Sequence, residues 1–256
     1  MSAHKRLFTV LELLAVVCVI LVLVSMLLPA MSSLREKSRR LVCLSSMKQI
    51  GIGLMGYAAS NRNCVPKRTS VSSQYPGMLH EDGDNNAVFG RSFNQVLPGI
   101  FDYDSGKGTE FFTCKSQRFS AKQMWENSGN GNWRCIGFFY WSIVRTDGLI
   151  WSFPRPKFSS GRITDVDSLT PLLSDPVAYA GTVIYNANHV KNGLSGNGYV
   201  PIGNGFGPNG GYYNTSGTPT GINQLHADGS GRWYKPEQLR KAFTTGWGWD
   251  MYAGYE

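Results

Sequence analysis

Residues 8–28 read FTVLELLAVVCVILVLVSMLL, and this stretch decides how the rest of the chain is interpreted. Only Thr9, Glu12 and Ser25 are polar among its 21 residues. At 1.5 Å per residue, a helix of this length spans about 31 Å. That length matches the roughly 30 Å hydrocarbon core of a bilayer. The sequence therefore predicts a transmembrane helix over residues 8–28.

A cleaved secretory signal is the alternative for the same stretch. Its apolar core usually has about 7–15 residues, followed by small residues at the cut site. The uninterrupted apolar part, residues 13–24, overlaps that range, but Ser25, Met26 and Leu27 make a poor cut site. The pattern favours a helix that the mature protein retains.

Glu12 is the unusual residue of the span, because a carboxylate among apolar residues costs about 2.5–3.5 kcal/mol on insertion scales. It could reach the lipid headgroups from its place near the end of the span, or it could pair with a cation. The chain has no Lys or Arg between Arg6 and Arg35. A cationic partner would therefore be a nearby chain terminus or another protein, and we favour such a pairing.

The helical pattern continues beyond Pro29, although proline removes a backbone hydrogen bond and kinks a helix. Apolar residues recur there at i+3 or i+4, namely Leu41, Leu44, Met47, Ile50, Leu54 and Tyr57. Asn61, Asn63 and Pro66 are stop signals. We expect one helix from residue 8 to about 61, whose amphipathic continuation, residues 29–62, packs on a globular head.

Three glycines interrupt the amphipathic part: Gly51, Gly53 and Gly56. Each weakens a helix by about 1 kcal/mol relative to alanine. They are either tolerated there, or they let a neighbouring element approach closely. The sequence leaves both readings open.

The net charge of +8 belongs to the N-terminal quarter. Residues 1–68 carry ten Lys or Arg and two acidic residues, so the rest of the chain is neutral. Charge beside an apolar span is more typical of membrane topology than of DNA binding, and no nucleic acid is expected as a partner. A count of basic residues in the short flanks would by itself place the head in the cytoplasm.

With Cys18 inside the span, four cysteines remain for the head: Cys43, Cys64, Cys114 and Cys135. In an oxidising compartment they could form two disulfides in three alternative pairings, or they could stay free. None of them forms a C-x-x-C pair, so the spacing does not predict a zinc site.

Residues 67–256 are predicted to form an α+β head with a small antiparallel sheet. Strands are expected at residues 111–114, 137–144, 149–153, 169–175 and 183–185, with a turn at 146–148. INQLHADGSGRWY, residues 222–234, is typical of a hairpin with Asp228 and Gly229 in its turn. The glycine-rich stretch 193–231 is expected to be largely a long loop, and residues 235–243 a short terminal helix.

The head is not expected to be an enzyme. It lacks G-x-S-x-G, H-E-x-x-H and P-loop motifs, and it offers only His80, His189 and His226 for acid–base work at neutral pH. Asp175, His189, His226 and Asp228 could converge, because all lie in or near the C-terminal strands. No cofactor is expected, because the sequence lacks a dense run of Asp, Asn and Glu ligands such as an EF-hand loop.

Residues 7–31, LFTVLELLAVVCVILVLVSMLLPAM, resemble the N-terminal segment of type IV pilins and type II secretion pseudopilins. That class has a short basic leader, a Phe-Thr opening, a Glu as the fifth mature residue and a long apolar helix. Phe8, Thr9 and Glu12 match this pattern, and Pro29 falls where many pilins carry a proline. MKQIGIGLMGYAASNRNCVP, residues 47–66, resembles the continuation seen in bacterial pilin-like families.

The resemblance implies a leader, residues 1–7, that prepilin peptidase removes between Leu7 and Phe8, followed by N-methylation of Phe8. The family's leader normally ends in Gly, where this chain has Leu7, and a retained leader is the alternative. The resemblance also implies an inner-membrane subunit with a periplasmic head, which reverses the orientation given by the charge count. The family's type II major pseudopilins use a calcium-binding loop, so calcium is the alternative to no cofactor, with Asp175 and Asp228 as its candidate ligands.

In such a protein Phe8, Glu12 and Pro29 serve assembly with other pilin-like subunits, identical or different, and with the assembly machinery. The product is a secretion or pilus-like filament that can extend outside the cell. The alternative is a permanently anchored periplasmic or surface protein, whose aromatic head binds a glycan or a protein and does not polymerise.

Overall fold

The computed structural model describes residues 9–66, 68–70, 78–80, 86–116, 134–141, 143–145, 162–180, 183–191, 196–197, 218–244 and 249–255. The chain divides into two compact units, Met1–Arg39 and Arg40–Glu256, and we describe each by itself. One helix, α1 (Val10–Ser60), carries the chain from the first unit into the second.

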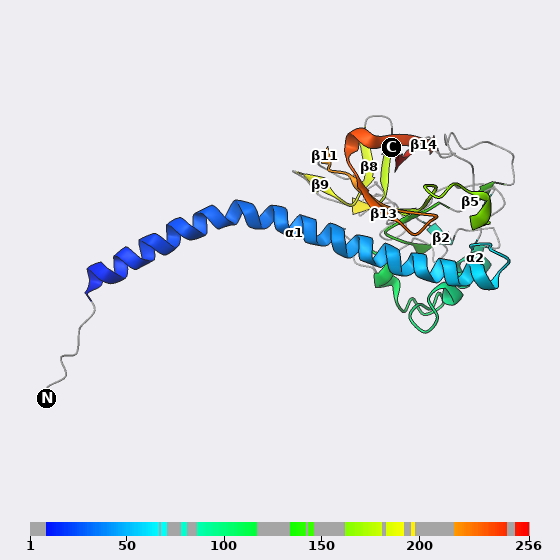
Figure 1. Cartoon of the computed structure of the whole chain (residues 1–256), viewed down its shortest axis with the longest axis horizontal. Helices are drawn as coiled ribbons and strands as arrows, with labels where there is room; N and C mark the ends of the chain where they lie inside the picture. Colours follow the sequence, from blue (N-terminus) through cyan, green and yellow to red (C-terminus); the bar gives the residue numbers. More distant parts are fainter. Residues whose placement is uncertain are drawn as a thin grey trace, which may run out of the picture. The chain divides into compact units, whose positions relative to one another are not determined.

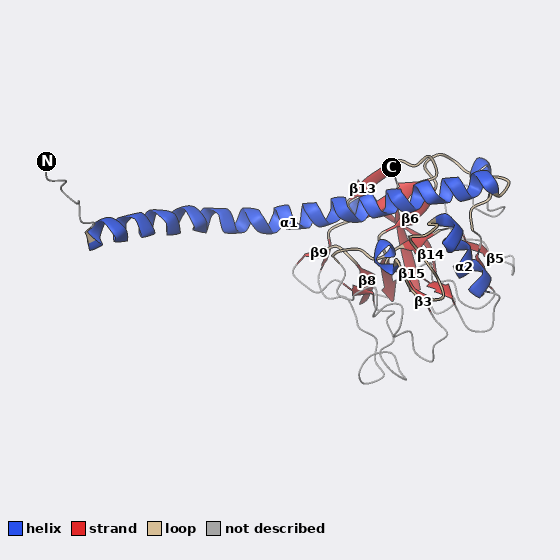
Figure 2. Ribbon diagram, turned by 90° about the horizontal axis from the view of Figure 1, so that it is seen from below, coloured by secondary structure: helices blue, strands red, loops and turns tan. Residues whose placement is uncertain are grey.

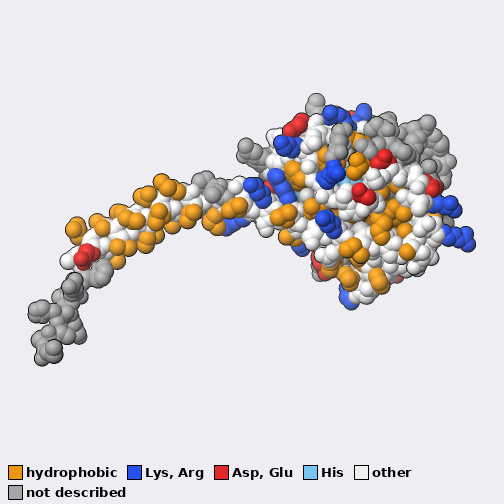
Figure 3. Space-filling model, viewed as in Figure 1, with side chains coloured by type: hydrophobic (Ala, Val, Ile, Leu, Met, Phe, Trp, Pro, Cys, Tyr) orange, Lys and Arg blue, Asp and Glu red, His pale blue; other side chains and the backbone are white. Residues whose placement is uncertain are grey.

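Helix α1 runs for 51 residues and passes Pro29 without a break, as the sequence predicted. Its first part, Val10–Leu27, is long and apolar enough to cross a membrane, and none of it is buried inside the protein. Hydrophobic side chains cover the face of this part that Figure 3 shows. We call Val10–Leu27 the apolar segment.

Residues 40–60 of α1 belong to the second unit, and we call them the head segment. One face of the head segment is buried, at a spacing of three or four residues: Cys43, Met47, Ile50, Leu54 and Ala58. These side chains join a core cluster with Leu172, Leu173 and Leu225 of the sheet. The predicted amphipathic face is therefore present, although Leu41 lies outside it and is exposed.

Two of the three helix glycines are explained by close packing. A Cβ on Gly51 would lie 2.5 Å from Cδ2 of Leu225, and one on Gly53 would collide with the backbone carbonyl oxygen of Val96. Gly56 faces open space. Val96 ends helix α2 (Asn86–Val96), which the sequence analysis did not predict and which lies beside the head segment in Figure 1.

The described part of the head contains two larger sheets, and every strand pair in them is antiparallel. Figure 2 shows their strands in red. The four-stranded sheet has the order β13-β12-β6-β4, from Gly231–Tyr234, Ile222–His226, Pro171–Ser174 and Phe139–Tyr140. The five-stranded sheet has the order β10-β8-β7-β15-β14, from Gly196–Asn197, Val183–Ala187, Val177–Ala180, Trp249–Gly254 and Leu239–Thr244. The α+β class predicted from sequence is confirmed.

Three strand pairs complete the described head. A parallel pair joins β1 (Arg68–Ser70) to β5 (Ile143–Arg145), and antiparallel pairs join β2 (Met78–His80) to β3 (Arg134–Cys135) and β9 (Val190–Lys191) to β11 (Thr218–Pro219). Short 3₁₀ helices lie at η1 (Thr109–Phe112), η3 (Ile163–Asp165) and η4 (Pro236–Gln238).

The predicted hairpin at residues 222–234 is confirmed as β12 and β13. The N–H of Gly229 donates to the carbonyl of His226, and Gly229 has a φ of +79°. Such a tight turn followed by a left-handed glycine is a common three-residue hairpin connection. The predicted strands near residues 137–144, 169–175 and 183–185 are likewise present as β4 and β5, β6, and β8.

Two local predictions were wrong. Residues 111–114 are not a strand, because Phe112 ends the 3₁₀ helix η1 and its ring packs edge-on against Phe93 and Phe101. Residues 235–243 are not a helix beyond the single turn η4, because β14 pairs with β15. In both places packing against a distant segment overrides the local pattern. The expected strand 149–153, its turn at 146–148 and most of the glycine-rich stretch lie outside the described residues.

Candidate functional site

The start of α1 carries a reciprocal pair of hydrogen bonds between Thr9 and Glu12. The backbone N–H of Thr9 donates to Oε2 of Glu12 at 2.9 Å, and the N–H of Glu12 donates to Oγ1 of Thr9 at 3.2 Å. The hydroxyl of Thr9 also donates to Oε2, at 3.1 Å. This is a capping box, in which two otherwise unpaired donors at the helix start are satisfied together.

Glu12 therefore has a partner within its own chain that sequence reasoning missed. The T-x-x-E spacing before an apolar run was the signal that could have revealed it. The carboxylate also sits where the partial positive charge of the helix start stabilises it. Leu7 and Phe8 lie outside the described residues, and Pro29 lies within α1.

In the head, a disulfide joins Cys43 of the head segment to Cys114, which follows η1. Their Cα atoms are 5.2 Å apart, and the two positions are separated by 71 in the sequence. Both residues are buried. Among the four cysteines proposed for pairing, Cys64 is a free thiol in the described structure, and the side chain of Cys135 lies outside it.

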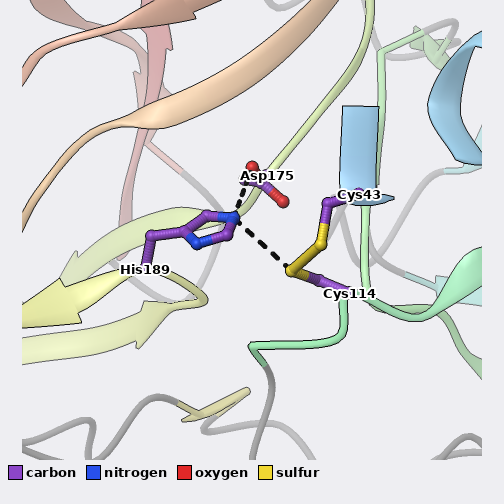
Figure 4. A group of neighbouring side chains, drawn as sticks. All are labelled: Cys43, Cys114, Asp175 and His189. Atoms are coloured by element: carbon purple, nitrogen blue, oxygen red, sulfur yellow. Dashed lines mark hydrogen bonds and ion pairs between the residues drawn. A yellow bond between two sulfur atoms is a disulfide. The ribbon is translucent and has the colours of Figure 1, made fainter. Parts of the chain in front are cut away.

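A buried Asp–His pair lies directly beside this disulfide (Figure 4). Asp175 follows strand β6, and His189 follows strand β8 by two residues. The Nε2 atom of His189 lies 3.1 Å from Oδ2 of Asp175 and 3.5 Å from Sγ of Cys114. We call Cys43, Cys114, Asp175 and His189 the buried cluster; their candidate ligand atoms all lie within 4.8 Å of one another.

The carboxylate of Asp175 is held by amide groups on both oxygens. Its Oδ2 accepts the backbone N–H of Asn223 at 2.8 Å and the side-chain amide of Asn223 at 3.0 Å. Its Oδ1 accepts the side-chain amide of Asn188 at 3.2 Å. A buried carboxylate needs such donors, because without them the loss of hydration would be very costly.

Arg40 connects this network to the helix. Its carbonyl accepts the side-chain amide of Asn223 at 3.1 Å, and its Nη2 donates to Oγ1 of Thr220 at 2.9 Å. The guanidinium lies 3.9 Å from the ring centroid of Trp233, whose ring in turn meets the edge of His189. The start of the head segment is thus tied to the strands by polar and cation–π contacts.

Each sulfur of the buried cluster also faces a backbone N–H. The N–H of Lys115 donates to Sγ of Cys43 at 3.2 Å, and the N–H of Ser116 donates to Sγ of Cys114 at 3.4 Å. The segment after η1 therefore supplies one backbone N–H donor to each sulfur. All four side chains of the cluster are buried, which suits a structural or ion-binding role better than turnover of a substrate.

The structure brings together only part of the predicted polar set. Asp175 and His189 meet, whereas His226 contacts Tyr234, Gln224 and Ser230 in the neighbouring hairpin. Asp228 is exposed in the turn and accepts the N–H of Ser230 at 2.8 Å. No pattern in the sequence placed Cys43 and Cys114 beside Asp175 and His189, because the four positions come from separate segments.

No family model, curated protein or solved structure matches this chain. The protein has an apolar N-terminal helix followed by a small antiparallel-sheet domain. Function must therefore be argued from the residues themselves.

Proposed function

We propose that this protein is a pilin-like (pseudopilin) subunit that assembles through its N-terminal helix into a type II secretion or type IV pilus-like filament. The observation that carries the proposal is the continuity of α1. One unbroken helix presents apolar side chains on all sides over Val10–Leu27 and then forms part of the core of a folded head.

An apolar helix that no other part of its own protein covers needs either lipid or other helices around it. In the proposed mechanism the subunit waits in the inner membrane and then exchanges lipid for the helices of its neighbours. Contacts between different surfaces of identical subunits build helical filaments when the rotation from one subunit to the next does not close a ring. The mechanism is assembly, and it requires no catalysis by the head.

Glu12 sets the register of neighbouring subunits in this proposal. The capping box uses Oε2, so Oε1 can accept a bond from the N-terminal amine of the next subunit. A shifted register would leave that buried charge without its partner, which is costly in a low-dielectric surrounding. Prepilin peptidase would create the amine by cutting before Phe8, and the head would face the periplasm.

A second candidate function has its own supporting observation. The capping box gives Glu12 a role at the helix start that needs no neighbouring subunit. Together with Leu7 at the expected cut site, it favours a permanently anchored protein whose head binds a glycan or a protein partner. Mass spectrometry of the native N-terminus separates the two: a methylated Phe8 is expected for the filament subunit, and an intact leader for the anchor.

Two substitutions at one position test the register role. Gln at the third helical position also completes a capping box, so Glu12→Gln keeps the local bond and removes the charge, whereas Glu12→Leu removes both. Both variants are expected to insert into the membrane. If the charge pairs with a neighbour, both also abolish filaments, scored by electron microscopy of sheared surface material labelled with an antibody to the head.

Thr9→Ala is the matched control, because it weakens the capping box and keeps the charge. Filaments are expected to persist in this variant. Wild-type filament yield from Glu12→Gln would refute the register role and leave only the capping function.

A further inference from the structure

We infer that the buried cluster is a redox-gated metal site: when the disulfide is reduced, Cys43, Cys114, Asp175 and His189 together bind one Zn²⁺ ion. The inference goes beyond the proposed assembly function and does not depend on it. It rests on the geometry of the four side chains, on the donors around the sulfurs and on the chemistry of the ligand set.

Two distances within the cluster already lie close to those around a tetrahedral zinc. With bonds of about 2.3 Å to sulfur and about 2.0–2.1 Å to nitrogen and oxygen, neighbouring N and O ligands lie about 3.3 Å apart and S and N ligands about 3.6 Å apart. Here Nε2 of His189 lies 3.1 Å from Oδ2 of Asp175 and 3.5 Å from Sγ of Cys114. A metal would need the two sulfurs to separate to about 3.8 Å, which breaking the disulfide permits.

The backbone around the sulfurs is arranged for thiolates. Cys43 and Cys114 each accept a backbone N–H, from Lys115 and Ser116 respectively. Hydrogen bonds to an ionised acceptor are stronger than those to a neutral one, so these donors stabilise the thiolates that zinc requires. A disulfide makes little use of them, because its sulfurs carry no charge.

The groups behind the ligands also fit a metal site. Asn223 donates to Oδ2 of Asp175, the oxygen that faces the histidine, and Asn188 donates to Oδ1. Outer partners of this kind orient the ligands of metal centres. Two thiolates, one carboxylate and Zn²⁺ sum to a charge of −1. The guanidinium of Arg40, stacked on the Trp233 ring that meets His189, is the nearby compensating cation.

The ligand set selects zinc over calcium. Sulfur and imidazole ligands suit Zn²⁺, whereas Ca²⁺ takes six to eight oxygen ligands. Absence of a C-x-x-C pair does not argue against this site, because its ligands come from α1, the segment after η1, and the ends of β6 and β8. Asp228 is not part of the cluster.

The chemistry balances with a dithiol as reductant. The dithiol gives two electrons and two protons to the disulfide and becomes a disulfide itself, which leaves two thiols on Cys43 and Cys114. Zinc binding then releases the two thiol protons to water. A disulfide oxidant reverses the sequence: it takes two electrons from the thiolates and two protons from water, becomes a dithiol, and the re-formed disulfide releases the ion. The head segment is thus fastened to the head by a covalent bond in one state and by a metal in the other.

The test uses the full-length protein in detergent, with Co²⁺ as a spectroscopic substitute for Zn²⁺. After reduction by a phosphine and removal of excess reagent under argon, the wild type is titrated with Co²⁺. We expect one equivalent to bind with a thiolate-to-cobalt band and the intense visible bands of tetrahedral cobalt. The oxidised protein is expected to show neither. Zn²⁺ added to the cobalt-loaded reduced protein is expected to replace Co²⁺ and remove these bands.

Cys64→Ser is the matched control, because Cys64 is a free thiol outside the cluster, and its spectrum should equal that of the wild type. Cys43→Ser should lose the thiolate band. The comparison of reduced and oxidised wild type decides the matter even if Cys43→Ser fails to fold. A reduced wild type without the bands, whether folded or not by circular dichroism, overturns the inference, as does a spectrum that depends on Cys64 rather than on Cys43.

Discussion

The two ends of α1 share one helix but differ in what surrounds them. In the apolar segment, Leu14 is 60% exposed and belongs to no core. In the head segment, Leu54 is fully buried, while Ile52, two residues earlier, is 74% exposed. The backbone hydrogen bonds of a helix are the same in both places, so the difference lies entirely in the partner that each face meets. A residue's contribution to stability therefore depends on its surroundings and not on its helical state.

The polar contacts follow the same division. The head segment is fastened by a disulfide and by the bonds of Arg40 to the strands. The described part of the apolar segment shows local side-chain bonds, such as the capping box and the bond from the hydroxyl of Ser25 to the carbonyl of Val22. The printed polar contacts thus tie the head segment to the rest of the head, whereas those of the apolar segment stay within α1.

The largest expected effect comes from the covalent link. Reducing the disulfide in the presence of a chelator should lower the free energy of unfolding of the head by about 4 kcal/mol, the value that the chain-entropy model gives for a loop of this length. All seven tryptophans lie beyond residue 124, so their fluorescence during urea unfolding reports on the head. An unfolding midpoint that reduction leaves in place would contradict this.

A pair of leucines compares the two segments directly. Leu54→Ala should destabilise the head by about 3.5 kcal/mol, because it leaves a cavity in a packed core. Leu14→Ala, the same change in the same helix, should leave the head's unfolding curve unchanged. Equal effects of the two substitutions would mean that the segments are not energetically distinct.

Two arginine substitutions make the opposite comparison, because here the larger effect is expected in the apolar segment. Val17→Arg places a charge inside the apolar segment and should raise the insertion free energy by about 3 kcal/mol. Ile52→Arg lies on the exposed face of the head segment and should insert as the wild type does. Alkaline extraction of membranes measures both, and equal retention of Val17→Arg and Ile52→Arg would contradict the expected cost of a charge in the apolar segment.

The smallest expected effect depends on pH and is confined to the head. The slight loss of hydration at the exposed Asp228 would by itself raise its pKa. Hydrogen bonds from Ser230 and the charges of His226 and Arg232 outweigh that loss and hold the pKa below its ordinary value. The ionised form is therefore favoured by folding, so this contribution is present above the unfolded pKa of about 3.9 and is lost as pH falls through the folded pKa.

Asp228→Asn tests this with little change to the turn, since Asn-Gly and Asp-Gly both suit hairpins. The variant should lose stability at neutral pH but match the wild type in strong acid, as followed by fluorescence-detected unfolding. A constant difference between the two proteins from neutral pH to strong acid would assign the effect to turn geometry instead of charge.

Local pattern predicted the features that local physics controls. The apolar run, the i+3 and i+4 spacing through Leu54 and the Asp-Gly turn each carry their signal within a few residues, and each is present. The strand expected at residues 111–114 and the helix expected at 235–243 failed because distant segments decide their conformation. Phe112 is drawn into a ring cluster with Phe93 and Phe101, and β14 is paired by β15.

By itself, the sequence determined that this protein has a long helix, apolar at one end and amphipathic at the other, and an α+β head. Those properties follow from hydrophobic periodicity along a continuous stretch of chain. Only the tertiary structure decided that Cys43 meets Cys114 and that Asp175 and His189 lie against their sulfurs. These residues are brought together by strand order and helix packing, and sequence spacing carries no information about such contacts.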